Sequence, residues 1–119
     1  MRVLVGLCLA VLCALPVTAA ELVMVEQAGC IYCARWDAQI APIYPKTAEG
    51  RFAPLRRVDI RTVEETVKVT RRVLFTPTFL VVEDGTERAR LEGYAGDAFF
   101  WPLLDEILRD ATDYTGETP

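Results

Sequence analysis

The stretch EQAGCIYCARWD, residues 26–37, holds two cysteines, Cys30 and Cys33, separated by two residues. An apolar run of strand length, residues 22–25, precedes it, and apolar side chains at helical spacing follow it. The pair is therefore predicted to lie where a buried strand passes into a helix, and Gly29 permits a tight turn there. A metal site, a structural disulfide and a redox pair all use cysteines at this spacing.

The first twenty residues have the layout of a secretory signal peptide. A single cation, Arg2, is followed by an uncharged apolar run over residues 3–15 and then by small residues. The run is short for a membrane-spanning helix. We therefore expect cleavage after Ala19 or Ala20, export of the mature chain and one domain over residues 21–119.

Charge and cysteine count narrow the possible functions. The sequence has 13 basic and 17 acidic residues and no histidine. The leader contains one of the cations and no acid, so the mature chain has 12 basic and 17 acidic residues and a net charge of −5. This balance argues against nucleic acid as a partner, because phosphate binding needs clustered cations. Cys8 and Cys13 leave with the leader, so only Cys30 and Cys33 remain.

The remaining pair is poorly suited to a structural role. A disulfide between residues three apart closes a very small loop and removes little entropy from the unfolded chain. A structural zinc site needs four ligands, which two cysteines without histidine do not supply. Two thiolates could hold a Cu(I) ion, so a non-catalytic Cu(I)-binding protein stays as an alternative. The redox interpretation needs no cofactor.

The rest of the chain alternates strand and helix patterns. In order, we expect a strand at 22–25, a helix from Cys33 that Pro42 kinks or ends, a strand at 55–60, a helix at 62–73 with a Thr62–Glu65 capping box, a strand at 74–84, an EDGT hairpin turn, a returning strand at 87–94 and a helix at 97–110. The first half forms a βαβ unit with parallel strands, and the second a hairpin followed by a helix. The predicted class is α/β, with a mixed four-stranded sheet and helices on both faces.

Two details of the last segments can be checked against a structure. In the returning strand, Ala89 and Leu91 alternate with charged residues, which are expected to face solvent. In the last helix, the inner face is predicted to consist of Leu103, Leu104, Ile107 and Leu108. Pro102 is awkward if Asp97 is the N-cap, so the helix is expected to start near Phe100 or with an irregular turn.

The position of the cysteines predicts their chemistry. Cys30 lies at the expected helix N-terminus, where unpaired N–H groups and positive potential favour a thiolate over a thiol. Cys33 lies about one turn inside and is expected to be more buried. We therefore expect thiol–disulfide exchange in which Cys30 attacks and Cys33 resolves the mixed disulfide.

The motifs GCIYC after a buried strand, then TPTF, then a hairpin and a helix resemble the thioredoxin superfamily. The resemblance covers nearly the whole mature chain and implies a minimal thioredoxin fold. It implies that Cys30 is the nucleophile and Cys33 the resolving cysteine. It also implies a cis Thr76–Pro77 peptide bond, pairing of the Thr76 backbone with a partner strand, and a place for Gly93 in the partner groove.

Three positions depart from the usual thioredoxin pattern. Ile31 and Tyr32 stand between the cysteines, where thioredoxins usually have Gly-Pro, and we expect both to contact the partner. Thioredoxins usually bury an acid six residues before the first cysteine. Here that position is Met24, so the role of a proton-accepting acid is vacant.

A closer resemblance is carried by ELVMVEQAGCIYCARWDAQIAPIYP, FTPTF and LEGYAGDAFFWPLL. These segments are similar to the periplasmic thioredoxin-like protein of bacterial sulfur-oxidation (Sox) gene clusters. The similarity implies a reductant that keeps a cysteine-bearing sulfur-carrier protein active, with electrons from a membrane thiol transporter. The alternative within the same fold is a disulfide oxidase or isomerase. Since an isomerase normally dimerises and no dimerisation segment is visible, we expect a monomer.

Overall fold

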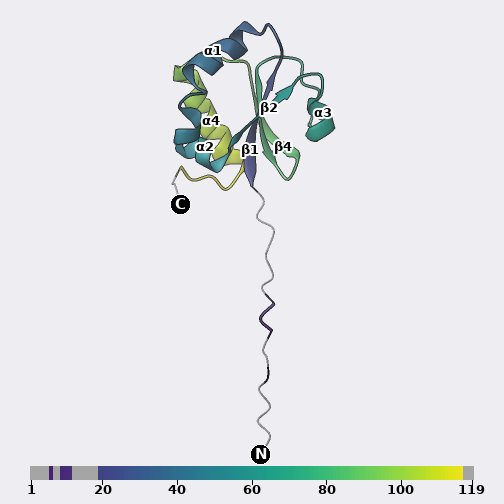
Figure 1. The fold of residues 1–119 in the computed structure, drawn as a ribbon. Coiled ribbons are helices and arrows are strands. Elements are labelled where there is room, and N and C mark those ends of the chain that lie inside the picture. Colours follow the sequence, from purple (N-terminus) through teal and green to yellow (C-terminus); the bar gives the residue numbers. More distant parts are fainter. Residues whose placement is uncertain (1–5, 7–8, 12–18, 117–119) are drawn as a thin grey trace, which may run out of the picture.

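The computed structural model describes residues 6, 9–11 and 19–116 (Figure 1). Most of the predicted signal peptide, residues 1–20, lies outside the described residues. The elements are β1 (Ala20–Glu26), α1 (Ile31–Gln39), the 3-10 helix η1 (Tyr44–Lys46), α2 (Ala48–Phe52), β2 (Leu55–Asp59), α3 (Val63–Thr66), β3 (Thr78–Glu83), β4 (Thr86–Glu92) and α4 (Asp97–Ala111). Among the described residues, no helix has both the length and the apolar character to cross a membrane.

The four strands form one mixed sheet in the order β2-β1-β3-β4. β1 and β2 are parallel, while β3 is antiparallel to both β1 and β4. Helices α1, α2 and α4 lie on one side of the sheet and α3 on the other (Figure 1). The predicted α/β class and mixed four-stranded sheet are therefore confirmed.

The face under α1 and α4 is covered by an aromatic core. Trp36 of α1 is fully buried, with its ring centroid 5.2 Å from that of Phe79 on β3 and 5.8 Å from that of Phe100 on α4. The Tyr44 hydroxyl donates to the carbonyl of Ala53 over 2.6 Å, which ties η1 to the chain entering β2. Trp36 packs tilted against Phe79 and edge to face against Phe100, so these rings fix α1 against β3 and α4.

The opposite face is covered by a smaller, aliphatic cluster. The strands supply Val23, Val25, Leu80 and Val82, and the segment around α3 supplies Val63, Val67 and Val73. Successive strand residues point to opposite faces, which explains why the unbroken apolar runs of β1 and β3 are buried on both sides.

A helix begins where it was predicted, after Thr62, but its predicted extent to Val73 and its capping box are wrong. α3 ends at Thr66, and the Thr62 side chain makes no capping bond. The N–H of Lys68 donates to the carbonyl of Gly85 over 2.8 Å, and the N–H of Glu87 donates to the carbonyl of Lys68 over 3.0 Å. A bridge to the edge strand β4 therefore takes the hydrogen bonds that a longer helix would have made.

The last helix has the predicted extent, but its inner face differs from the prediction. α4 begins at Asp97 after the capping residue Gly96, as the range 97–110 predicts, and Pro102 lies inside it, so the alternative start near Phe100 is wrong. Phe100, Leu104 and Leu108 are buried, whereas Leu103 is 40% exposed. These buried residues recur every four positions and form one stripe, which leaves Leu103 beside the stripe.

The alternation expected in β4 is broken by a bulge. Val81 pairs with Ala89 and Val82 with Glu87, so Arg88 is an extra residue on β4. The side chains of Glu87 and Arg90 are buried although both were expected to face solvent. A bulge shifts the facing of every residue beyond it, and a simple period-two pattern does not detect it.

Candidate active site

The cysteine pair occupies the junction of β1 and α1. Cys30 is the N-cap of α1, and its Sγ accepts a hydrogen bond from the N–H of Cys33 over 3.1 Å. The two residues form a disulfide, with their Cα atoms 5.2 Å apart. Gly29, just before the cap, has a φ of +79°, a conformation that glycine adopts without strain. The turn at Gly29 thus places Cys30 directly at the N-terminus of α1.

The two cysteines differ in their access to solvent. Cys33 is 5% exposed and belongs to the aromatic core cluster, whereas Cys30 is half-buried. Both border a cleft of about 520 Å³ on the β2 side, together with Glu26 and Asp37. Of the two sulfur-bearing residues, Cys30 is the more open to a second protein.

The segment that enters β3 lies at the same end of the sheet. Thr78 pairs with Val25, so β3 begins beside the strand end that leads to the cysteines. The Thr76–Pro77 peptide bond is cis. The N–H of Gly93, just past β4, donates to the carbonyl of Pro77 over 2.8 Å. This bond holds Gly93 against the segment that carries Thr76 and Pro77.

Exposed apolar side chains lie between the cysteines, in the segment that enters β3 and along the first half of α4. Ile31 and Tyr32 lie between the cysteines and are both exposed. On one side Tyr32 borders a hollow of about 440 Å³ whose wall includes Gly93, Phe99 and Leu103. Leu74 and Phe75, which precede Thr76, are also exposed. We name these six side chains the apolar rim: Ile31, Tyr32, Leu74, Phe75, Phe99 and Leu103.

A charged cluster lies on the β2 side of the pair. The Arg57 guanidinium donates to Asp37 over 2.7 Å and to Glu26 over 2.8 Å. The bond to Asp37 raises the pKa of Arg57, so the cation persists at any physiological pH. The Cζ atom of Arg57 lies 5.8 Å from the centroid of the Trp36 ring, in a cation–π contact. Met24 is fully buried, so the position of the usual thioredoxin acid carries no charge.

Within the residues that the structure describes, no group of three or more His, Cys, Asp or Glu side chains is arranged to hold a metal ion.

Comparison with known proteins identifies the family. A family model described as a thioredoxin-like domain matches residues 19–108. The chain belongs to the thioredoxin-like family. No curated protein sequence matches the chain. Among solved structures, the chain is similar to the reduced form of the periplasmic thioredoxin SoxS from Paracoccus pantotrophus. The two share 49% sequence identity and a TM-score of 0.74, over 77% of this chain and 98% of that one.

Family membership and geometry together give the activity. A thioredoxin-like domain with a disulfide at a helix N-terminus is a thiol–disulfide oxidoreductase. The resemblance to the thioredoxin-like proteins of sulfur-oxidation gene clusters is confirmed by the likeness to SoxS.

The sequence identified the cysteines, Thr76, Pro77 and Gly93 as site residues, and the structure places them at one end of the sheet. It did not identify Leu74, Phe75 and Phe99 as part of the site. In the sequence, the one indication was that these large apolar residues lie in loops or at a helix start. There they belong to no apolar face of a helix or strand. The Arg57 cluster leaves no local signal in the sequence, because its partners come from β1 and α1 and only the fold brings them together.

Proposed function

We propose that this protein is a periplasmic reductant that keeps a cysteine-bearing sulfur-carrier protein of a sulfur-oxidation system in its thiol form. The observation that carries the proposal is the cysteine disulfide at the N-terminus of α1. The likeness to a periplasmic thioredoxin named SoxS, at 49% identity over nearly all of that protein, supports the pathway and the compartment. The signal peptide at residues 1–20 is the proposed route of export.

The proposed reaction uses Cys30 as nucleophile and Cys33 as resolving cysteine. In the reduced protein, the Cys30 thiolate attacks one sulfur of the client disulfide, forming a mixed disulfide and releasing the first client thiolate. Cys33, as its thiolate, then attacks the Cys30 sulfur, which releases the second client thiolate. Two electrons pass from the dithiol to the client, and the Cys30–Cys33 disulfide remains. The described structure is in this oxidised state.

The surroundings of Cys30 support this division of roles. The Cys33 N–H that donates to Sγ of Cys30, together with the positive end of the α1 dipole, stabilises negative charge on that sulfur. Burial of Cys33 keeps it away from the client until a mixed disulfide lies beside it. When Cys33 attacks the Cys30 sulfur of the mixed disulfide, the client thiolate leaves and the Cys30–Cys33 disulfide forms.

The apolar rim supports a protein client. A small disulfide needs only access to Cys30, whereas six exposed apolar side chains in the segments around the pair offer area for a polypeptide. In the proposed complex, the Thr76 backbone pairs with the client strand and Gly93 borders the groove. Ile31 and Tyr32 contact the client beside its cysteine. The oxidised protein is then reduced by a membrane thiol transporter, and the protein itself acts as a monomer.

The equilibrium reduction potential of the Cys30–Cys33 pair tests the direction of electron flow. It is measured by equilibration with glutathione or dithiothreitol buffers and quantification of the free thiols. A value near that of thioredoxin, about −270 mV, supports a reductant. A value near that of a strong periplasmic oxidant, about −120 mV, overturns it and favours disulfide donation.

The client class is tested separately. Reduced protein is mixed with purified sulfur-carrier protein whose cysteine is blocked in a disulfide, and the release of carrier thiol is followed. Release much faster than by dithiothreitol at equal thiol concentration supports the proposal. Equal rates with an unrelated disulfide protein contradict a dedicated client.

A further inference from the structure

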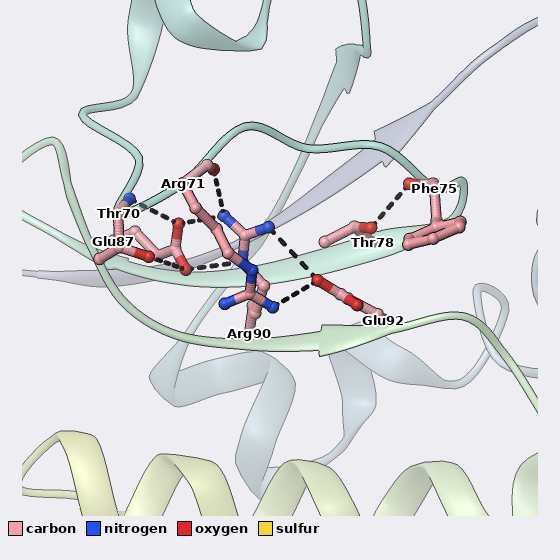
Figure 2. A network of polar contacts seen from close by, with 7 residues as sticks. All are labelled: Thr70, Arg71, Phe75, Thr78, Glu87, Arg90 and Glu92. Carbon is pink, nitrogen blue, oxygen red and sulfur yellow. Dashed lines mark hydrogen bonds and ion pairs between the residues drawn. The ribbon is translucent and has the colours of Figure 1, made fainter.

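A buried ion pair lies away from the cysteines, on the other face of the sheet. The guanidinium of Arg90 donates to the carboxylate of Glu87 through two nitrogens, over 2.6 and 2.8 Å (Figure 2). The two side chains are only 5% and 3% exposed. Thr70 donates to the same carboxylate from its N–H and its hydroxyl, each over 3.1 Å. The Glu87 carboxylate is therefore fully hydrogen-bonded.

The β4 bulge is what brings the pair together. Side chains three residues apart on a regular strand point to opposite faces. The extra residue Arg88 cancels this offset, so Glu87 lies opposite Val82 and Arg90 lies opposite Leu80. Val82 and Leu80 belong to the same aliphatic cluster, so both members of the ion pair point to that face.

The pair binds the segment that leads to the site. Arg90 donates to the carbonyl of Arg71 over 2.7 Å. Glu92, two residues along β4, accepts from Arg71 over 2.5 Å and from Arg90 over 3.5 Å (Figure 2). Residues 70–76 belong to no helix or strand, and among the described residues no main-chain-to-main-chain hydrogen bond holds them. Their polar tethers are side chains of β4 and Thr78.

Stability alone is a weak explanation for such a pair. Burying two charges costs several kcal/mol of solvation, and replacing a buried pair by apolar residues of similar size is often neutral or stabilising. The pair sits in an otherwise aliphatic cluster, where leucine and methionine would pack. Apolar residues could not make the directed hydrogen bonds that the pair makes to Thr70 and Arg71.

We propose that the Glu87–Arg90 pair is a positioning device for the client-binding edge, because it fixes residues 70–77 against β4. The segment presents Leu74 and Phe75 to solvent, 66% and 59% exposed, immediately before Thr76. Glu92 links this segment to the end of β4, where Gly93 borders the hollow beside Tyr32. The pair thus sets the spacing between two walls of the client groove while touching neither cysteine. This inference rests on the proposed action on a protein disulfide.

The test uses a charge-neutral double variant, Glu87→Leu with Arg90→Met. The matched control is Glu21→Leu with Arg56→Met. That pair is also joined by two bonds of 2.9 Å, but it bridges β1 and β2 and does not contact residues 70–77. Insulin serves as the protein disulfide, and 5,5′-dithiobis(2-nitrobenzoic acid) as a small disulfide that needs only an exposed thiol. Trypsin, which can cut after Arg71 and Arg72, reports directly on the segment.

We expect the double variant to remain folded, with an unchanged reduction potential and an unchanged rate toward the small disulfide. Its KM for insulin should rise roughly tenfold with little change in kcat, because misplacement of a binding edge weakens productive docking. Tryptic cleavage after Arg71 and Arg72 should accelerate by a similar factor, and the control should match the wild type in every readout. Wild-type cleavage and wild-type KM in a folded double variant overturn the proposal.

Thr70→Val keeps the proposal testable if the double variant does not fold. This change removes one bond from the segment to Glu87 and leaves the ion pair intact. We expect faster cleavage after Arg71, by roughly two- to threefold. Unchanged cleavage contradicts the tether. A wild-type protein that reduces neither disulfide refutes the proposed function instead, while the cleavage rates still decide whether the pair holds the segment.

Discussion

The N–H of Cys33 points at the Sγ of Cys30 over 3.1 Å, across the first turn of α1. One residue of the pair therefore supplies a hydrogen-bond donor to the other. In the reduced protein the same donor can stabilise a thiolate on Cys30, since it belongs to the helix backbone and does not depend on the disulfide. The arrangement gives the two sulfurs unequal roles although only two residues separate them.

Exchange of either cysteine for serine should separate these roles. We expect Cys30→Ser to abolish disulfide reduction, because no accessible thiolate remains. We expect Cys33→Ser to accumulate mixed disulfides with the client, because the resolving attack is lost. Non-reducing gel electrophoresis after incubation with insulin or a carrier protein reads both results. Trapping by Cys30→Ser and none by Cys33→Ser would reverse the assignment.

The fold was predictable from the sequence wherever a buried pattern decided it. The apolar runs that became β1 and β3 are buried on both faces, and such runs leave few alternatives to central strands. The helix predicted from Thr62 to Val73 was wrong beyond Thr66, because a contact between distant residues decides the backbone there. Val63, Val67 and Val73 are spaced as on a helix, and all three are buried, but the backbone between them pairs with β4 instead. A bridge between distant residues leaves no local signature.

The site was predictable to the extent that it depends on residues close in sequence. Cys30, Gly29 and the start of α1 form one local turn, so a short stretch sufficed to place them. Contacts between residues of different helices and strands could not be predicted from the sequence. Arg57 meets Asp37 and Glu26 only because β2 lies beside β1, and Glu87 meets Arg90 only because of a bulge. Pairings of this kind follow from register, which a single sequence does not encode locally.

The apolar rim should govern protein clients and not small disulfides. Phe99→Ser removes a 61% exposed ring beside the hollow. We expect a several-fold higher KM for insulin, roughly three- to tenfold, from the loss of one buried aromatic contact. The rate with a small aromatic disulfide and the unfolding midpoint should stay within error, because the ring packs little in the free protein.

Ile43→Ser is the matched control for this change. Ile43 is a similarly exposed apolar side chain, between α1 and η1, and it borders neither the cleft nor the hollow. Its KM for insulin should equal that of the wild type. An equal increase for both variants would show that general surface apolarity, and not the rim, sets the affinity.

Gly50 should tolerate no side chain. A Cβ at this position would overlap the carbonyl oxygen of Tyr44 and lie 2.6 Å from the carbonyl carbon. Because both are backbone atoms of η1, Gly50→Ala must displace η1 or α2. We expect a loss of about 2–3 kcal/mol in the free energy of unfolding, measured in urea. Arg51→Ala, at the next and exposed position, should cost at most about 0.5 kcal/mol, and a similar loss there would contradict the steric cause.

The buried ion pair should make stability depend on acid pH. Burial of Glu87 by itself would raise the pKa of its carboxyl group. The bonds from Arg90 and Thr70 and the Arg90 charge together outweigh burial and lower that pKa below its ordinary value of 4.5. A folded-state pKa below the unfolded one means that the pair stabilises the protein above about pH 4.5. This contribution is lost as the pH falls through the folded-state pKa.

Glu87→Gln isolates this contribution. At neutral pH the variant should be clearly less stable, because it leaves the Arg90 cation buried without its counter-charge. As the pH falls below about 4.5, the wild-type stability should fall toward that of the variant, so the difference between their urea midpoints should shrink. Glu106→Gln, at an exposed position on α4, should follow the wild type at every pH. A difference between Glu87→Gln and wild type that stays constant down to about pH 3 would mean that the Glu87 carboxylate is not the group that titrates.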